Sequence, residues 1–527
     1  MKVCSNQSQL SLVVEGCAAN VSSALKQIRY APLSLPVTIS HVDETASALS
    51  TIDPSGRYVE VARTSHCDVK ALGAKLEMSP KRLSKKRLTL INPVNNVRSG
   101  FAVNPSSRFP PLGLGILASL TPDDWEVELL DENFAPFSYR DADLVGITAF
   151  TSAANRAYEI ASIYRDQGVP VVMGGIHASM CSDEALRFAD AVVVGEAESV
   201  WRQVLADAQS GRLRGLYHGQ WLDPDRVAPP RRDIYSDEYV FASVQTSRGC
   251  PLDCEFCSVT AYNGRRYRRR PVADVLDELE TLNNEMVFFV DDNIIGNGAS
   301  CRKQALELFQ GMVARGMNKT WFCQASISVA DDAEVLDWAA RAGCRMIFIG
   351  IEAEDIGALT EVNKRLNLKK GASAYQETFD RIHASGISVL GAFIFGMDSD
   401  TPEALFRRAE FMVNSDVDAM QLTTMTPLPG TRLFQRLEEE ERLLYTNFPN
   451  DWAHYDLTKL VHRPKSMPPD ELWDIIRQCT ERVYDLRTLK TKAKRTLETT
   501  GSMEATEFAY RTNINYRNIG LALGTLV

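Results

Sequence analysis

The strongest constraint on the fold is an alternation of short apolar segments with amphipathic stretches that begins at residue 87. The apolar segments of the first series read RLTLINP, WEVELLDEN, ADLVGITAF, VPVVMGGI and AVVVGE. Segments that are apolar throughout, rather than at every second position, predict parallel strands covered by helices on both faces. Residues 87–211 are therefore expected to form a doubly wound, Rossmann-like α/β domain, a fold whose ligands bind at the carboxyl ends of the strands.

A second series of apolar segments follows a stretch rich in proline. Residues 212–240 contain Pro224, Pro229 and Pro230 among charged residues, which predicts a linker. Six further strand-like segments start near residue 241 and end before residue 430, the first being VQTSRG and the last DAMQLTTMTP. Six β/α units over residues 241–430 predict a partial, TIM-like (β/α)6 barrel with its chemistry at the carboxyl ends of the strands.

The two ends of the chain carry weaker signals. Residues 1–86 show no sustained period of helix or strand, so this N-terminal extension is assigned no function. Residues 431–527 are mostly helical in pattern and charged, and we expect them to close or cover the barrel mouth. A chain of 527 residues, 45% of them hydrophobic, is expected to form two or three domains with ordinary cores.

Charge and cysteine content restrict the class of protein. The net charge of −10 provides no broad cationic surface, so we expect no affinity for nucleic acid. No apolar stretch approaches the roughly 18 residues that span a bilayer, so no transmembrane segment is predicted. The 11 cysteines are an odd number and three lie within eight residues, which favours metal ligation in a reducing compartment and predicts a cytoplasmic protein.

The three close cysteines predict a metal centre. Cys250, Cys254 and Cys257 form a C-x-x-x-C-x-x-C pattern directly after the first strand of the second series. Three thiolates leave one iron of a four-iron cluster without a protein ligand, and substrate chemistry can occur at that iron. A zinc site would need a fourth Cys or His nearby, and none lies between Cys257 and Cys301. Small buried loop residues are the alternative, which the charged neighbours of the cysteines disfavour.

With Phe256 before the last cysteine, the segment QTSRGCPLDCEFCSVTAYNGRRYRRR resembles the radical S-adenosylmethionine superfamily. The resemblance implies a [4Fe–4S] cluster whose open iron chelates the amino and carboxylate groups of S-adenosylmethionine. It also implies that one electron from the cluster breaks the sulfonium bond and gives a 5′-deoxyadenosyl radical. Such an enzyme needs a reducing partner, for example a flavodoxin or a ferredoxin.

Polar residues at later strand ends fit the same resemblance. In relatives the corresponding positions lie near the methionyl amino group or the ribose of S-adenosylmethionine. Acidic residues at these places also cap helices, which is the alternative interpretation. The residues expected to bind this cofactor are Asp292, Asn293, Gln324, Ser326 and Glu352.

The first α/β domain resembles the cobalamin-binding domain that precedes many radical barrels. The matching segments are PPLGLG, LLDEN, GITAFTSAAN, GGIHAS and VVGEAE. Small residues at strand ends let the backbone approach a large planar ligand. The resemblance therefore implies a cobalamin site, and we expect it to include Thr148, Gly174, Gly175 and His177.

One departure from the cobalamin pattern concerns the ligand of the cobalt. The lower-ligand motif Asp-x-His-x-x-Gly would fall where this chain reads NPVNNVRSG, which contains no histidine. Either the cobalt is bound without a histidine, as in many radical relatives, or the domain has lost cobalamin. We favour binding, and we expect His177 only to line the pocket, because a single histidine is more often packed or hydrogen-bonded than a metal ligand.

Together these features predict radical-mediated methylation of an unactivated carbon in a small-molecule or lipid substrate, with cobalamin carrying the methyl group. No residue is assigned a catalytic role beyond cofactor binding. The first alternative is a cobalamin-dependent cyclase or rearrangement enzyme. A non-enzymatic iron–sulfur scaffold is the alternative from another class. A methylthiotransferase fits less well, because residues 87–211 contain only Cys181 instead of a second cysteine triplet.

A basic run follows the cysteine loop and has two interpretations. It is either a solvated turn or a site that recognises an anionic group of substrate or cofactor. Its members are Arg265, Arg266, Arg268, Arg269 and Arg270, with Tyr267 between them.

Overall fold

The computed structural model describes residues 85–98, 108–296 and 298–526, together with five short strands nearer the N-terminus. The chain divides into two compact units, residues 1–83 and residues 84–527. In the first unit, three strands form one sheet in the order β1-β2-β3, and two pair as an antiparallel ribbon. These strands are β1 Lys2–Asn6, β2 Gln9–Glu15, β3 Val37–Val42, β4 Leu49–Ile52 and β5 Tyr58–Val61. The rest of the predicted extension, residues 1–86, lies outside the described residues apart from the start of the next strand.

The first sheet of the second unit is parallel and has the order β11-β10-β9-β8-β6-β7. Its strands are β6 Lys86–Asn92, β7 Trp125–Asp131, β8 Leu144–Thr148, β9 Val171–Gly174, β10 Ala191–Val194 and β11 Gly215–His218. The chain starts at β6 and adds strands first on one side and then on the other. This confirms the doubly wound α/β prediction and creates a switch point between β6 and β8, where such folds bind ligands.

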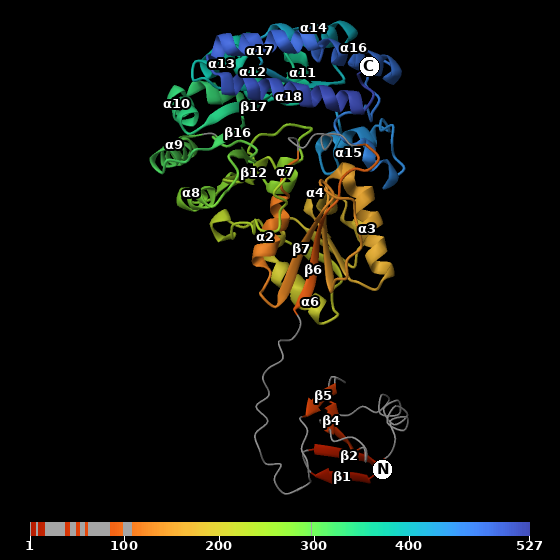
Figure 1. Ribbon diagram of the computed structural model, residues 1–527. Helices are drawn as coiled ribbons and strands as arrows, with labels where there is room; N and C mark the ends of the chain where they lie inside the picture. The colour runs from red at the N-terminus through yellow and green to blue at the C-terminus, as the bar shows by residue number, and fades with distance from the viewer. Residues whose placement is uncertain are drawn as a thin grey trace. The chain divides into compact units, whose positions relative to one another are not determined.

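Helices cover both faces of this sheet, with α3 on one side and α2 on the other (Figure 1). Alternate residues of β8 point to opposite faces, since Val145 packs with Tyr158 and Tyr164 while Leu144 packs with Trp201. Burial on both faces explains why the strands read as apolar runs. The helices are α2 Leu112–Leu120, α3 Ala154–Asp166, α4 Gly175–Met180, α5 Ser182–Ala185 and α6 Trp201–Gln209.

The edge strand β11 corrects one sequence prediction, because it lies inside residues 212–240, which were expected to be a linker. Only Tyr217 of its four residues is buried. An edge strand with one buried side chain has no apolar run, so the pattern gave no signal for it. The remainder of that range, through the three prolines, connects the two sheets as predicted.

The second sheet forms the predicted partial barrel, a parallel sheet in the order β12-β15-β16-β17-β18-β19. Its strands are β12 Phe241–Val244, β15 Met286–Phe289, β16 Thr320–Ala325, β17 Cys344–Glu352, β18 Ser388–Phe395 and β19 Ala419–Thr424. A short antiparallel ribbon, β13 Ser247–Arg248 with β14 Arg268–Arg269, flanks the cysteine loop. The connecting helices include α7 Val259–Asn263, α8 Val272–Glu280, α9 Ala299–Ala314, α10 Ala333–Arg341, α11 Ile356–Glu361, α12 Arg365–Lys370, α13 Tyr375–His383 and α14 Pro402–Asn414.

The C-terminal region is mostly helical as predicted, but its last helix does not cover the barrel mouth. Its elements are α15 Arg432–Glu439, η8 Asn450–His454, α16 Pro469–Val483, α17 Leu486–Thr500 and α18 Met503–Ala522. Ala509 of α18 packs with Phe241, Phe322 and Met346, which lie near the amino ends of their strands. An apolar helix face is buried best against this aromatic inner surface, so α18 fills the barrel from the end opposite the chemistry.

No helix in the described part of the chain is long and apolar enough to cross a membrane.

Candidate active site

The cysteine loop is held by its flanks while its thiols stay accessible. Cys250, Cys254 and Cys257 are free and partly exposed. Gly249 has φ +87°, and a Cβ there would overlap the carbonyl oxygen of Arg266, so only glycine permits this approach. Between the first two cysteines, the Asn363 side chain donates to the carbonyl of Asp253 at 2.6 Å, so the loop is held at its start and in its middle.

The donor chemistry of the three thiols fits an iron–sulfur cluster. Burial raises the pKa of Cys250, Cys254 and Cys257 above the ordinary value, that of Cys257 to about 12. The protein alone therefore holds thiols, and metal binding would deprotonate them. Among the described residues, no three such ligands converge on a single ion position. Three cysteines in one short loop suit a four-iron cluster, in which each thiolate binds a different iron.

The end of β15 carries two carboxylates with different roles. Asp291 is fully buried and accepts hydrogen bonds from the Thr246 N–H at 2.9 Å and the Ser247 hydroxyl at 2.6 Å, so it holds the end of β12 in place. Asp292 accepts only a long bond of 3.5 Å, from Asn263. Burial, followed by repulsion from Asp291, raises the pKa of Asp292 to about 6. Of the two, Asp292 is available to a ligand.

Two of the predicted cofactor ligands bind each other. The Asn293 amide donates to the Ser326 hydroxyl at 3.1 Å and to the Tyr267 hydroxyl at 2.9 Å. Its oxygen accepts from the backbone N–H of Ser326 at 3.3 Å. Gln324 lies near the end of β16, two residues before Ser326, and is partly exposed. Its side chain forms no hydrogen bond with the described residues. A role for these residues in cofactor binding stays a prediction, with Gln324 the least constrained of the three.

Glu352 adopts an unusual backbone conformation at the end of β17. Its φ is +65°, a left-handed value uncommon outside glycine. Its side chain forms an ion pair with Lys364, which the sequence analysis missed, and a Cβ at Gly350 would lie 2.6 Å from the Lys364 nitrogen. Burial alone would lower the pKa of Lys364, but Glu352 and the nearby Cys254 thiol raise it above its ordinary value. A permanent cation therefore lies beside the cysteine loop, although no sequence motif marked it.

The ligand edge of the first domain is lined by small residues. Gly175 has φ +85°, and a Cβ there would overlap the Thr148 hydroxyl and lie 3.5 Å from the Ala149 nitrogen. Gly174 precedes it at the end of β9. Phe150, which follows β8, is 75% exposed. Close backbone approach and an exposed ring at the switch point suit a large planar ligand such as a corrin.

His177 is fully buried and does not offer a free nitrogen. Its Nε2 lies 3.0 Å from the Tyr158 hydroxyl and its Nδ1 lies 3.3 Å from the Thr151 hydroxyl. Glu184 lies 3.4 Å from Nε2, and the ring of Trp452 packs edge-on. The structure thus uses His177 to join the first domain to the C-terminal region, and its expected place in the cobalamin pocket stays a prediction.

The basic run after the cysteines holds the structure together through ion pairs and hydrogen bonds, a role that neither sequence interpretation predicted. Arg268 is buried and ion-paired with Glu196 of the first domain. Arg270 pairs with the buried Glu278, and Arg269 donates to the carbonyl oxygens of residues 294 and 295 at 3.3 Å. The run is therefore neither a solvated turn nor an open anion site over these three residues.

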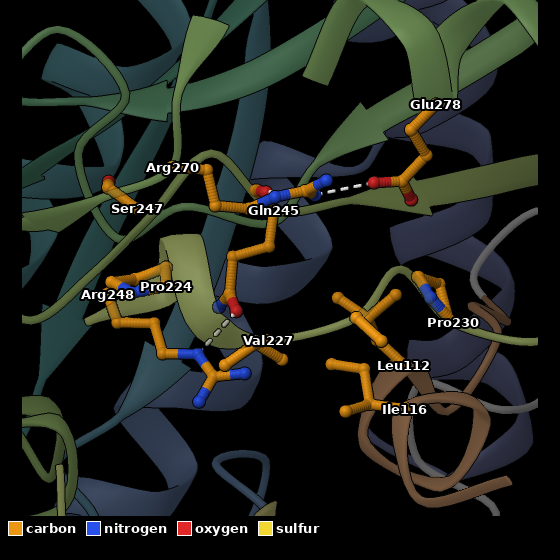
Figure 2. Close-up of a pocket in the computed structure, with 11 residues that line it drawn as sticks. Leu112, Ile116, Pro224, Val227, Pro230, Gln245, Ser247, Arg248, Arg270 and Glu278 are labelled. Atoms are coloured by element: carbon orange, nitrogen blue, oxygen red, sulfur yellow. Dashed lines mark hydrogen bonds and ion pairs between the residues drawn. The ribbon is translucent and has the colours of Figure 1, made fainter. Parts of the chain in front are cut away.

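A small crevice, with a volume of about 20 Å³, lies where α2, the linker and the ends of β12 and β13 meet (Figure 2). Figure 2 shows the Arg248 guanidinium turned toward Gln245, whose side-chain oxygen accepts its Nε–H at 2.8 Å, and Arg270 reaching Glu278. The apolar side of the crevice comes from Leu112 and Ile116. The lining residues come from the first domain, the linker and the barrel, so the crevice belongs to the domain junction.

Comparison with known proteins gives the same two domains. A model of the Radical SAM superfamily matches residues 244–412, and a model of the B12 binding domain matches residues 99–205. The bacteriochlorophyllide d C-12(1)-methyltransferase of Chlorobaculum tepidum is 28% identical over 77% of this chain and 89% of its own length. The hopanoid C-2 methylase of Rhodopseudomonas palustris is 29% identical over 71% of each chain.

Solved structures share the fold. The radical S-adenosylmethionine methyltransferase TsrM of Kitasatospora setae, with cobalamin and a [4Fe–4S] cluster bound, has a TM-score of 0.60 at 17% identity, covering 82% of this chain and all of that one. The cobalamin-dependent enzyme OxsB also has a TM-score of 0.60, at 14% identity, covering 94% of this chain and 83% of that one.

These matches confirm the predicted cofactors, namely a [4Fe–4S] cluster, S-adenosylmethionine and cobalamin, and they confirm the prediction of a methyltransferase. The chain belongs to the radical S-adenosylmethionine enzymes that carry a cobalamin-binding domain in front of the radical barrel.

Proposed function

We propose that this enzyme methylates an unactivated carbon of a ring-rich, mainly apolar small molecule of the lipid or pigment type. The observation that carries the proposal is an aromatic inner surface directly below the polar strand ends. The relatives named above act on a bacteriochlorophyllide and on a hopanoid, both of which are ring-rich and largely apolar.

Alternation along the strands places this surface inside the barrel. In β16, Phe322 shares its side with Gln324, while the alternate residues Trp321, Cys323 and Ala325 pack outward against the helices. Phe288 stacks on Phe322 with ring centroids 4.2 Å apart, and Phe109 lies 4.8 Å from Phe288. Phe348 of β17 joins this cluster and is only partly buried. On the amino-end side, α18 already covers this cluster, because Phe508 packs against Phe241 and Phe322. Phe288 and Phe348 lie nearer the polar strand ends and are only partly buried. Partly exposed aromatic rings of this kind bind flat or polycyclic apolar groups by stacking and burial.

The chain's own residues divide the work of binding. When bound, the cluster, S-adenosylmethionine and cobalamin supply the electron, the carbon radical and the methyl group. Cys250, Cys254 and Cys257 would hold the cluster. Asp292 would accept hydrogen bonds from the amino group of S-adenosylmethionine, and Glu352, oriented by Lys364, would accept from its ribose. The buried aromatic surface would exclude water from the substrate carbon.

The test uses the reconstituted holoenzyme with S-adenosylmethionine carrying a trideuterated methyl group. A hopanoid and a bacteriochlorophyllide are offered separately, and the product is examined by mass spectrometry. We expect the labelled methyl group in the product of one of them, and none with Cys254→Ala. Substrate that loses hydrogen without gaining the label would support cyclisation or rearrangement instead. Absence of 5′-deoxyadenosine under strong reduction would support the non-enzymatic scaffold.

A cyclase function is favoured by one set of relatives. Anaerobic magnesium-protoporphyrin IX monomethyl ester cyclase of Rubrivivax gelatinosus is 26% identical over 63% of this chain and 64% of its own length. This cyclase matches a smaller share of the chain than the two methyltransferases named above, which match 77% and 71%, so methylation remains the first proposal.

We further propose that a flavodoxin or a ferredoxin donates the electron. The support is the chemistry of the family, which needs one low-potential electron for each cleavage of S-adenosylmethionine. Formation of 5′-deoxyadenosine with a reduced flavodoxin as the sole reductant would bear this out. If several flavodoxins and ferredoxins each failed to support 5′-deoxyadenosine formation, while dithionite supported it, the proposal would be contradicted.

A further inference from the structure

Four charged side chains meet between the first domain and the barrel, and we call them the junction network. Glu196 and Glu198 follow β10, while Arg248 and Arg268 come from the ribbon beside the cysteine loop. Arg268 forms a two-pronged ion pair with Glu196, one prong of 2.9 Å. Arg248 lies 3.3 Å from Glu196 and 2.7 Å from Glu198.

The junction network is almost completely removed from water. The side chains of Glu196 and Arg268 are 3% and 4% exposed, and those of Glu198 and Arg248 are each 10% exposed. Charges buried in this way persist only if every polar atom is well paired, because their desolvation is costly. The remaining hydrogen bonds come from the backbone N–H of Leu222, the carbonyls of Leu222 and Asn263, and the Gln245 side chain.

The junction network lies between the ligand edge of the first domain and the cysteine loop. Glu196 lies two residues beyond the carboxyl end of β10, at the edge where the first domain binds its ligand. Arg248 lies two residues before Cys250, the first ligand of the cluster. The Tyr262 hydroxyl, at 3.5 Å from the carbonyl of Gly195, adds a second tie between the same loops. The path from one cofactor edge to the other therefore runs through short, buried, charge-assisted contacts.

We propose that the junction network positions the two cofactors, because it fixes the cysteine loop against the ligand edge of the first domain. In this way it keeps cleavage of S-adenosylmethionine coupled to methyl transfer. The coupling part rests on the proposed function, whereas the positioning part concerns only the two cofactors. A stabilising role alone would not require the network to lie between these two loops. Small displacements of reacting groups have large kinetic effects, so a loosened junction would separate the two half-reactions.

The experiment compares wild type with Glu196→Gln in protein loaded with cluster and cobalamin. The reduced cluster and cob(II)alamin both carry unpaired electrons, and electron paramagnetic resonance measures their mutual coupling, which falls with distance. In Glu196→Gln we expect full cluster and cobalamin content but a weaker and more widely distributed coupling. Product formed per 5′-deoxyadenosine should fall about 10-fold to 100-fold.

Asp418→Asn is the matched control. Asp418 is another buried carboxylate, which lies 2.7 Å from His383 Nε2 and accepts the backbone N–H of Val389 at 2.6 Å, at the amino ends of β18 and β19. This position is away from both ligand-binding edges, so Asp418→Asn should lose stability while leaving the magnetic coupling and the product ratio as in wild type. An equal effect of Asp418→Asn on the coupling would overturn the proposal, as would wild-type coupling in a folded Glu196→Gln.

Three further variants keep the test decisive if Glu196→Gln fails to fold. Glu198→Gln removes the more exposed pair and should give a smaller change in the same direction. Arg248→Lys keeps the positive charge beside both glutamates and should lose less of the coupling than Arg248→Met, and an equal loss in the two variants would contradict an electrostatic tie. If wild type forms no methylated product, the proposed function fails, yet the magnetic coupling still decides the positioning claim.

Discussion

Replacing Gly175 by alanine tests the close approach of strand ends that forms the ligand edge of the first domain. Gly175 has φ +85°, and an added Cβ would overlap the hydroxyl of Thr148. Thr148 is β-branched and has few alternative rotamers, so it cannot easily move away. Gly168→Ala is the natural comparison, because Gly168 has a similar φ of +75° but nothing within 4 Å of its Cβ position.

The two variants differ by one energetic contribution. A left-handed conformation costs alanine about 1–2 kcal/mol, and both variants carry this cost. Both also gain about 0.4–1 kcal/mol from a less flexible unfolded chain. Only Gly175→Ala adds the overlap with Thr148, which by analogy with overpacked cores costs about 1–3 kcal/mol. The free energy of opening the strand ends should therefore fall by about 1–3 kcal/mol more in Gly175→Ala than in Gly168→Ala.

Hydrogen exchange of the amides in β8 and β9 measures this difference locally, without assuming two-state unfolding of a multidomain chain. The expected difference corresponds to exchange that is about 5-fold to 150-fold faster in Gly175→Ala than in Gly168→Ala. In a double-mutant cycle, adding Thr148→Ala to Gly175→Ala should remove the extra loss of opening free energy that the overlap with Thr148 causes. Cobalamin affinity should fall in Gly175→Ala only. Equal exchange in the two glycine variants would refute the close approach.

Three further predictions concern the cofactors. Alanine at Cys250, Cys254 or Cys257 should abolish both iron content and 5′-deoxyadenosine formation, and full cleavage activity in any one variant would remove the cluster assignment. Asp292→Asn should weaken binding of S-adenosylmethionine roughly 10-fold to 150-fold at pH 7.5, by loss of a charge-assisted bond of about 1.5–3 kcal/mol. Because the pKa of Asp292 is about 6, its carboxylate is ionised above that pH, so the ratio of wild-type to variant affinity should shrink as the pH falls through 6. We expect cobalamin to bind with its dimethylbenzimidazole base displaced, so the cob(II)alamin form should show no axial nitrogen splitting, since both nitrogens of His177 are engaged, and a splitting lost in His177→Ala would contradict this.

The sequence predicted those features that depend on local pattern. Apart from the edge strand β11, apolar runs predicted the strands of both parallel sheets, because burial on two faces leaves a continuous signal. The first barrel strand was placed too late, since β12 ends at Val244, where the predicted segment VQTSRG begins. Three cysteines spaced by three and two residues identified the cluster loop without any knowledge of its surroundings. The end of β15 at Asp292 was found in the same way, as a polar interruption of an apolar strand.

Features that depend on tertiary partners were missed. The edge strand β11 has one buried residue, Tyr217, and so resembles a linker in sequence. Lys364 is one of many lysines until Glu352 and the cysteine loop surround it. Asn293 and Ser326 were each expected to face a cofactor, but their mutual hydrogen bonds become visible only when β15 and β16 lie side by side.

Cofactor identity and cofactor spacing are set by different parts of this chain. On the proposed assignment, the thiols of the cysteine loop and the small residues at the strand ends would decide what binds, each within its own domain. The junction network decides how the two domains meet, and it does so with residues such as Arg268 and Glu196 that touch no predicted cofactor position. A chain could therefore keep both cofactors and still change its reaction by altering this junction, because methyl transfer requires both centres to reach one substrate carbon whereas cleavage of S-adenosylmethionine requires only the cluster. We therefore expect the choice between methylation and cyclisation to depend more on the residues of the junction network than on the cysteines. These residues are Glu196, Glu198, Arg248 and Arg268.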